Sequence, residues 1–128
     1  SIVSSNMGLS RHLLKSKIHR ALITDANLNY IGSISIDEEL MDAADIIEWE
    51  KIQVLNLTNG TRLETYVIKA PKGSREICIN GAAAHLINTG DVVILCTYVT
   101  VDYAEASKHT PTIIHVNNKN EIINSENI

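Results

Sequence analysis

The sequence predicts a mainly β protein, a small barrel or sandwich with two brief helices. About six or seven short stretches are rich in β-forming residues, and turn signals separate them roughly every eight to twelve residues. The 128 residues have the size of one domain with one core. We therefore expect residues 1–128 to form a single domain.

The first half of the chain contains two predicted strands and one predicted helix. Residues 18–24 and 28–36 alternate roughly between apolar and polar side chains, with a turn signal between them. Gly32 lies within the second pattern, where a glycine usually marks a bulge or a close approach of two backbones. Asp37 is a suitable N-cap for a helix over 38–44, because acidic residues follow it in the first turn.

The second half of the chain contains the remaining predicted strands. Asn59-Gly60 is a strong hairpin signal. Asn80-Gly81 turns the chain into an alanine-rich helical turn at 82–87, and the asparagine-rich end from residue 117 is expected to fray. The strands predicted here are 52–57, 62–69, 76–79, 92–101 and 112–116.

Composition and charge argue against several classes of protein. The net charge is −4 and the pI is about 5.7, so nucleic-acid binding is not expected. The longest apolar run, 92–96, is too short to cross a bilayer. Cys78 and Cys96 lie in apolar runs without a CxxC spacing, which is typical of reduced thiols in the cytoplasm. We expect a soluble, cytoplasmic protein with no membrane or nucleic-acid partner.

Residues 1–12 are interpreted as an N-terminal extension or tag remnant, with residues 1–6 as an expression remnant ahead of Met7. Basic residues interrupt each apolar stretch of this region, so it does not have the apolar segment of a signal peptide.

Metal and nucleotide chemistry have no support in the sequence. The histidines lack the short spacings of metal-binding motifs, and no phosphate-binding loop, GxSxG or GxGxxG motif occurs. The five histidines are His12, His19, His85, His109 and His115. We therefore expect no bound metal.

Several short sequence blocks indicate no function singly but match one family when taken together. They occur in order and without large gaps, and they resemble the pyruvoyl-dependent aspartate 1-decarboxylase family over roughly residues 13–111. The blocks are KIHRA at 17–21, YIGSISID at 30–37, LNLTNGTRLETY at 55–66, GSREICINGAAAH at 73–85 and GDVVIL at 90–95.

This resemblance implies a six-stranded double-psi β-barrel that assembles as a homotetramer, with active sites between neighbouring subunits. It also implies that the proenzyme cuts itself between Gly32 and Ser33, giving a β chain of 1–32 and an α chain of 33–128. Ser33 becomes a covalent pyruvoyl group. The implied reaction converts L-aspartate to β-alanine and carbon dioxide for pantothenate and coenzyme A synthesis. Some relatives need a helper protein for maturation.

The residue types suit this chemistry. Ser33 Oγ attacks the carbonyl carbon of Gly32, and the amide becomes an ester. Loss of the Ser33 α-proton expels that ester and leaves dehydroalanine, which water converts to the pyruvoyl group and ammonia. Serine is a weak nucleophile, so the turn must supply geometry and strain, which a flexible glycine permits. The resemblance assigns Thr65 to stabilising the oxyanion during this processing.

The resemblance also assigns roles in turnover. Arg62 matches the residue that grips a substrate carboxylate, for which its planar fork is suited, and Lys17 matches a second cation of that pocket. Tyr66 matches the proton donor that follows decarboxylation, because a tyrosine stays protonated at neutral pH. The residues implied to form the wall that positions the pyruvoyl amide and substrate are Asn80, Gly81, Ala82 and Ala83.

The sequence departs from the family pattern at Ile31, where an acidic residue is frequent, and at Leu55, where an aromatic one is. We expect altered processing rate or packing from these changes. His19 matches a common family residue that orients the pocket. Two other functions stay open: an uncut binding module, and a self-activating hydrolase that uses Ser33 as a nucleophile.

Overall fold

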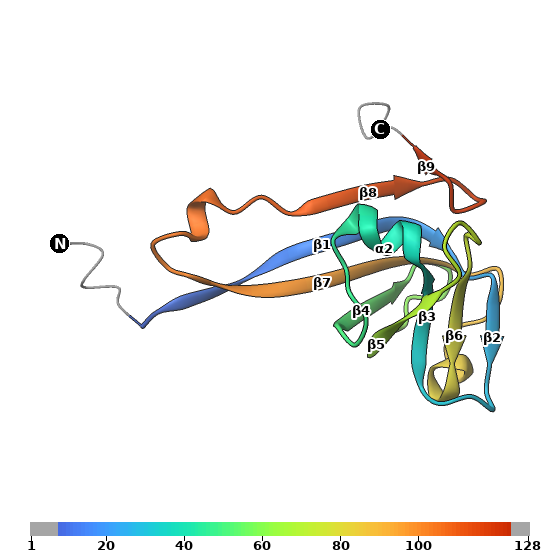
Figure 1. Ribbon diagram of the computed structural model, residues 1–128. Coiled ribbons are helices and arrows are strands. Elements are labelled where there is room, and N and C mark those ends of the chain that lie inside the picture. Colours follow the sequence, from blue (N-terminus) through green and yellow to red (C-terminus); the bar gives the residue numbers. More distant parts are fainter. Residues whose placement is uncertain (1–7, 124–128) are drawn as a thin grey trace.

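The computed structural model describes residues 8–123 and has a mainly β architecture, as the sequence predicts (Figure 1). One α-helix and two short 3-10 helices, η1 and η2, interrupt the strands. The elements are β1 Ser10–Leu22, β2 Asp25–Asn27, β3 Ser33–Asp37, α2 Glu38–Ala44, β4 Lys51–Asn56, β5 Arg62–Ala70, β6 Ile77–Asn80, η1 Gly81–His85, β7 Val92–Asp102, η2 Ala106–Lys108, β8 Thr112–Val116 and β9 Ile122–Ile123.

The strands form one mixed sheet in the order β2-β6-β3-β5-β4-β7-β1-β8-β9. Parallel pairs join β2 to β6, β3 to β5 and β1 to β8, and the other neighbours are antiparallel. Within the described residues the order runs from β2 to β9 without closing. The mainly β class is therefore confirmed.

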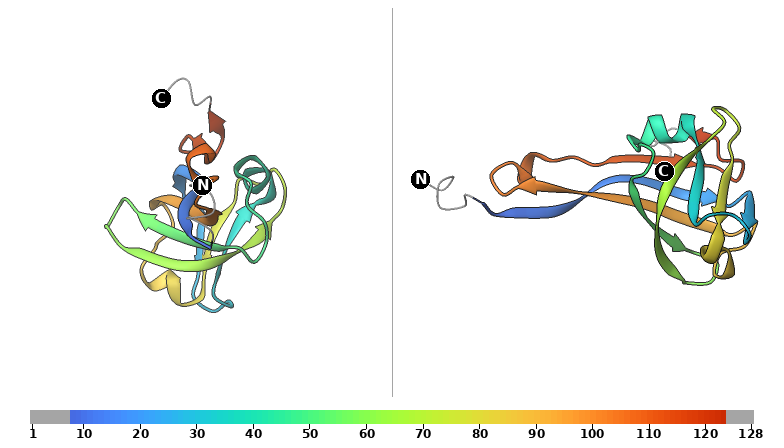
Figure 2. Two further views of the ribbon diagram at one scale, coloured as in Figure 1. Left: turned by 90° about the vertical axis from the view of Figure 1, so that its left-hand side faces the viewer. Right: turned by 60° about the horizontal axis from the view of Figure 1, so that its bottom comes forward.

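A single hydrophobic core lies on one face of this sheet. In β4 the buried side chains alternate with more exposed ones, as expected for a strand that faces a core on one side. All strands from β1 to β8 except β2 contribute buried side chains to one cluster, so the sheet curls around it (Figure 2). The largest fully buried side chains are Ile18, Ile23, Ile34, Ile36, Leu40, Met41, Ile52, Val54, Ile77, Ile79, Ile87 and Leu95.

Helix α2 covers the core from one side, and its bounds agree with the predicted helix 38–44 (Figure 1). Asp37 caps it, accepting a hydrogen bond from the Glu39 amide at 2.8 Å. Leu40, Met41 and Ala44 are buried against the sheet.

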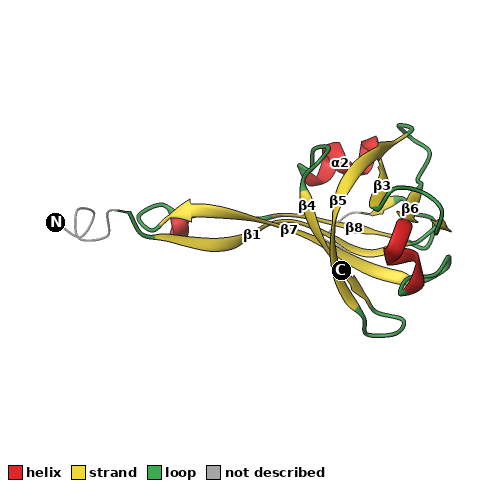
Figure 3. Ribbon diagram, turned by 90° about the horizontal axis from the view of Figure 1, so that it is seen from below, coloured by secondary structure: helices red, strands yellow, loops and turns green. Residues whose placement is uncertain are grey.

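The antiparallel pair β1 and β7 extends well beyond the core as an arm (Figures 1 and 3). The pairing continues from Ser10 opposite Asp102 to Leu22 opposite Val92, with two irregularities in the register. Residues 10–12, placed by the sequence in an N-terminal extension, thus belong to β1; residues 1–7 lie outside the described range. Strand β8 runs parallel to the inner half of β1.

The structure differs from the sequence prediction around the second predicted strand. Residues 25–27, predicted as a turn, form β2, because they pair with β6 far along the chain. Residues 28–32, predicted as strand, form the turn that leads to β3. Gly32 therefore precedes a strand instead of lying inside one.

The asparagine-rich end is ordered up to residue 123, so the predicted fraying is wrong for this part; residues 124–128 lie outside the described range. Asn120 is 1% exposed. Its Oδ1 accepts from the Leu22 amide, and its Nδ2 donates to the carbonyls of Leu22 and Arg75. These long-range partners order the segment. The short elements η2 and β9 were also not predicted.

Candidate active site

The Gly32–Ser33 bond lies where the exposed turn 28–32 enters β3. Gly32 is exposed, whereas Ser33 is only 1% exposed and pairs with Asn80 of β6. The chain thus passes from solvent to a buried position across this one peptide bond.

Asn80 holds the Ser33 hydroxyl. Its amide Nδ2 donates to Ser33 Oγ at 2.9 Å and to Ser35 Oγ at 3.0 Å, while its Oδ1 accepts from Cys78 Sγ at 3.3 Å. Burial raises the pKa of the Cys78 thiol, with Asp25 and Glu76 adding to the effect, so the thiol keeps the proton it donates. Ser33 Oγ donates in turn to the Ile31 carbonyl at 3.3 Å. Asn80 itself is 3% exposed.

A pocket of about 310 Å³ opens beside this bond. Five of the residues that the sequence predicted for the site line it: Gly32, Thr65, Asn80, Ala82 and Ala83. Leu63, Glu64 and Leu86 complete the lining. Residues from β5, β6 and η1 are thereby brought to the turn that precedes Ser33.

Gly81 lies directly against the backbone of this turn. A Cβ atom at Gly81 would be 2.7 Å from Gly32 Cα, 2.8 Å from Gly32 N and 3.0 Å from the Tyr30 carbonyl oxygen. Gly81 also has a left-handed φ of +69°. At Gly32 itself an added Cβ meets nothing within 4 Å, and φ lies outside the left-handed range. The close approach predicted for Gly32 thus depends on the absent side chain of Gly81.

Lys17, Arg62 and Tyr66 are not among the residues that line this pocket. The strand register places them on the sheet face directed away from the core. Lys17 is opposite Cys96, Cys96 is opposite Gln53, and Gln53 is opposite Glu64. Arg62 and Tyr66 lie two residues before and after Glu64 on β5, so they share its face. The predicted site residues therefore fall into two groups.

Lys17 and Arg62 both act on the Cys96 thiol of this outer face. Burial raises the pKa of this thiol, and the charges of Lys17 and Arg62 act in the opposite direction. Within residues 8–123 neither cation has a carboxylate at ion-pair distance. Two cations without an acidic partner are suited to an anionic ligand.

Tyr66 lies beside an exposed aromatic side chain. Its ring stacks on that of Trp49 with centroids 5.9 Å apart and an interplanar angle of 24°. Trp49 is 71% exposed and has a left-handed φ of +75°. An exposed tryptophan ring beside the predicted proton donor was not anticipated from the sequence.

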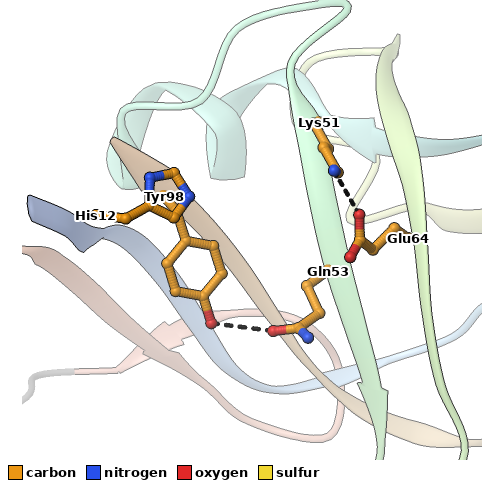
Figure 4. Close-up of a pocket in the computed structure, with 5 residues that line it drawn as sticks. All are labelled: His12, Lys51, Gln53, Glu64 and Tyr98. Carbon is orange, nitrogen blue, oxygen red and sulfur yellow. Dashed lines mark hydrogen bonds and ion pairs between the residues drawn. The ribbon is translucent and has the colours of Figure 1, made fainter. Parts of the chain in front are cut away.

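A second pocket of about 300 Å³ lies on the outer face, where the arm leaves the body (Figure 4). Tyr98 Oη donates to Gln53 Oε1 at 2.9 Å, and Lys51 pairs with Glu64 at 2.6 Å. The His12 ring stacks on Tyr98 with centroids 5.7 Å apart. This pocket was not predicted, because the register that joins its four strands is not visible in the sequence.

His19 of β1 lies opposite His115 of β8. Their ring centroids are 5.1 Å apart, edge to face, and the buried Nδ1 atom of His19 has no hydrogen-bond partner among residues 8–123. Burial lowers the pKa of His19, and the nearby Lys17, His115 and Arg20 lower it further. The neutral form of this histidine is therefore favoured.

Residues 8–123 contain no group of three or more histidine, cysteine or acidic residues arranged to hold a metal ion. None of the described helices is both long and apolar enough to cross a membrane.

The sequence of the chain is similar to a known family and to several known proteins. The family described as Aspartate decarboxylase matches residues 9–123, nearly all of the described chain. A protein named Aspartate 1-decarboxylase from Heliobacterium modesticaldum is 61% identical over 90% of this chain and 87% of its own. Proteins of that name from Campylobacter concisus and Pelotomaculum thermopropionicum are 60% and 57% identical, over 87% of this chain and 95% and 84% of theirs.

These similarities first define the class of protein, a decarboxylase. The chain belongs to the aspartate decarboxylase family.

Proposed function

We propose that this chain is a self-processing, pyruvoyl-dependent enzyme that converts L-aspartate to β-alanine and carbon dioxide, supplying pantothenate synthesis. Family membership supports the reaction. The observation that carries the self-processing is the position of Ser33, whose buried Oγ is bonded by Asn80 beside a pocket that contains Gly32 and Thr65.

In the proposed self-cleavage the nucleophile is the Ser33 hydroxyl that Asn80 bonds. Ser33 Oγ attacks the Gly32 carbonyl carbon, the C–N bond breaks, and the freed amine carries the proton. Removal of the Ser33 α-proton then breaks the ester C–O bond, leaving a carboxylate on Gly32 and dehydroalanine at 33. Water converts the latter to the pyruvoyl group and ammonia. Thr65 and Asn80 are the polar side chains at the pocket that can stabilise the oxyanion.

The pocket fits a pyruvoyl group at residue 33, because small residues of η1 line it and leave room for a substrate. The group supplies a carbonyl that reacts with the substrate amine and accepts the electron pair left by carbon dioxide. Asn80, Ala82 and Ala83, with the Gly81 backbone beside the turn, position the substrate next to it.

Lys17 and Arg62 bind the substrate carboxylates, and Tyr66 donates the proton that replaces carbon dioxide. The absence of acidic partners within the described residues supports the first role. Since these residues lie outside the pocket of their own chain, we propose that a neighbouring copy supplies them. A homotetramer of double-psi barrels, with sites between subunits, provides such neighbours.

Two features of the proposal concern its setting. Cys78 and Cys96 are free, buried thiols, which supports a cytoplasmic location. Ile31 is 75% exposed in the scissile turn, so a maturation helper protein has access to this segment.

Leu55 is half-buried on β4, where it replaces an aromatic residue of the family.

A denaturing gel of the purified protein, together with intact-mass analysis, tests the proposal. We expect two fragments, one ending at Gly32 and one beginning with a blocked residue 33. Ser33→Ala should abolish both the cut and β-alanine formation. A chain that stays uncut, alone and with bacterial cell extract, would support the binding module. A free serine amine at 33 would support the hydrolase.

A further inference from the structure

The backbone of Gly81 supports the residue that carries the scissile carbonyl. A side chain at 81 would overlap Gly32 N and Cα at 2.8 and 2.7 Å, distances that real Cβ atoms essentially never show. The overlapped atoms are backbone, so they cannot rotate away as a flexible side chain would. The turn and Gly81 are therefore in direct backbone contact.

The residue before Gly81 holds the other reacting group. Asn80 Nδ2 donates to Ser33 Oγ at 2.9 Å, and Asn80 is fixed by its pairing with Ser33 across β6 and β3. Consecutive residues thus contact the nucleophile and the residue whose carbonyl it attacks. Both contacts come from the point where β6 ends and η1 begins.

We propose that Gly81 is a positioning residue for self-cleavage: its missing side chain allows its backbone to fix the Gly32 peptide against the Ser33 hydroxyl that Asn80 holds. This inference rests on the proposed self-processing and adds no chemical step to it. By this inference a glycine is required at position 81 and not at position 32, because Gly32 has free space around its Cα and no left-handed φ.

Gly81→Ala should slow cleavage by roughly 10- to 100-fold, because the turn must move by about an ångström and misplacement on that scale costs reactivity of this order. Gly60→Ala and Gly90→Ala are matched controls. They impose the same left-handed strain, at φ of +80° and +91°, but an added Cβ meets nothing within 4 Å at either position. Both should be cut at the wild-type rate.

The rate is measured as the fraction cut over time on denaturing gels, with folding of each variant checked by circular dichroism. A spectroscopic readout separates positioning from general destabilisation. In the uncleavable Ser33→Ala background, Gly81→Ala should shift the amide NMR signals of residues 30–32, whereas the two controls should leave them unchanged.

A folded Gly81→Ala variant that is cut at the wild-type rate overturns the inference. Failure of Gly81→Ala to fold, while both controls fold, also overturns it, because Gly81 would then be a requirement for folding. A wild-type chain that is never cut refutes the proposed self-processing itself, and this outcome is distinguishable because it does not involve Gly81.

Discussion

One amide group, that of Asn80 at the end of β6, joins this strand to two hydroxyls of the neighbouring β3. It is 3% exposed and it donates to two hydroxyls while it accepts from a thiol. Buried groups that lose a partner keep the full cost of desolvation, so this network has a large effect for its size. Its loss affects both the fold and the orientation of Ser33.

Asn80→Ala is expected to slow self-cleavage at least tenfold, because Ser33 Oγ loses its donor and the oxyanion loses a neighbouring amide. The variant should also lose about 1–3 kcal/mol of stability through the unpaired groups. Ser35→Ala is the matched control, since Ser35 bonds the same amide but lies outside the scissile turn. The cut fraction over time and urea unfolding measure both effects; equal cleavage rates would contradict the assignment.

At the scale of elements, a buried carboxylate joins the start of α2 to the loop before β6. Asp37 is 1% exposed and accepts from the amides of Glu39, Gly73 and Arg75 at 2.8, 2.8 and 2.7 Å. The contact to Glu39 is a helix cap, and the other two fix the loop. One side chain thus orders two segments that are distant in sequence.

Asp37→Ala should destabilise the protein by about 3 kcal/mol, the sum of a lost cap and of buried amides without an acceptor. Asp42→Ala is the control, because Asp42 forms an exposed ion pair with Lys72 and such pairs contribute little. Urea unfolding in the Ser33→Ala background measures the difference. A similar midpoint for the two variants would contradict the role of Asp37.

The seam between β1 and β8 is expected to respond to pH through His19. Because the pKa of His19 is lowered on folding, the unfolded chain binds the proton more readily. Its contribution to stability is complete above the ordinary histidine value of about 6.5 and falls as the pH decreases below it. The groups facing it are Lys17, Arg20 and His115.

His19→Gln should therefore lose less stability than the parent protein between pH 7.5 and 5.5. His85→Gln, at the exposed end of η1, is the control and should behave like the parent. Unfolding midpoints in urea at both pH values, in the Ser33→Ala background, provide the measurement. Equal pH dependence of the parent and the His19 variant would refute this role.

Elements with local signals could be predicted from the sequence, and elements with distant partners could not. The helix 38–44 has its cap, its acidic first turn and its apolar face within a few residues, and its predicted bounds were correct. β2 is a strand only because β6 lies beside it, and the outer part of β1 because β7 does. Asn120 is ordered by partners 45 and 98 residues away.

The candidate site also divides into what local signals predict and what distant partners decide. The resemblance to a family identified its residues, but local patterns did not place Thr65 beside Gly32 or Lys17 on the same face as Arg62. Both placements depend on the register of the sheet. The contact of Gly81 with the turn depends on how η1 packs and is invisible in the sequence. The roles in catalysis stay predictions.

At the scale of the whole molecule, the candidate residues fall into two groups, those that line the pocket beside Gly32 and those on the outer face with Lys17 and Arg62. Glu64 lines the pocket of Figure 4 as well as the pocket beside Gly32, whereas Lys17, Arg62 and Tyr66 line neither. The β1–β7 arm extends the outer face away from the body, which gives a neighbouring copy a large surface to contact (Figures 1 and 2).

Complementation tests the sharing of sites between copies. Ser33→Ala and Arg62→Ala should each be inactive alone, and co-expression of the two should restore a fraction of the wild-type β-alanine production, since mixed assemblies contain some intact sites. Light scattering should give about four times the chain mass of 14.1 kDa. Inactive mixed assemblies would show that each site comes from one chain.

Strand pairing has a last consequence for the mature form. The proposed cleavage after Gly32 would leave β1 and β2 on one piece and their partners β6, β7 and β8 on the other. The buried Ile18 and Ile23 also belong to the shorter piece. Once denatured, the two pieces must meet by diffusion before they can fold, so maturation turns a unimolecular folding reaction into a concentration-dependent association. Refolding of the cut protein would therefore depend on its concentration, whereas refolding of the uncut precursor would not.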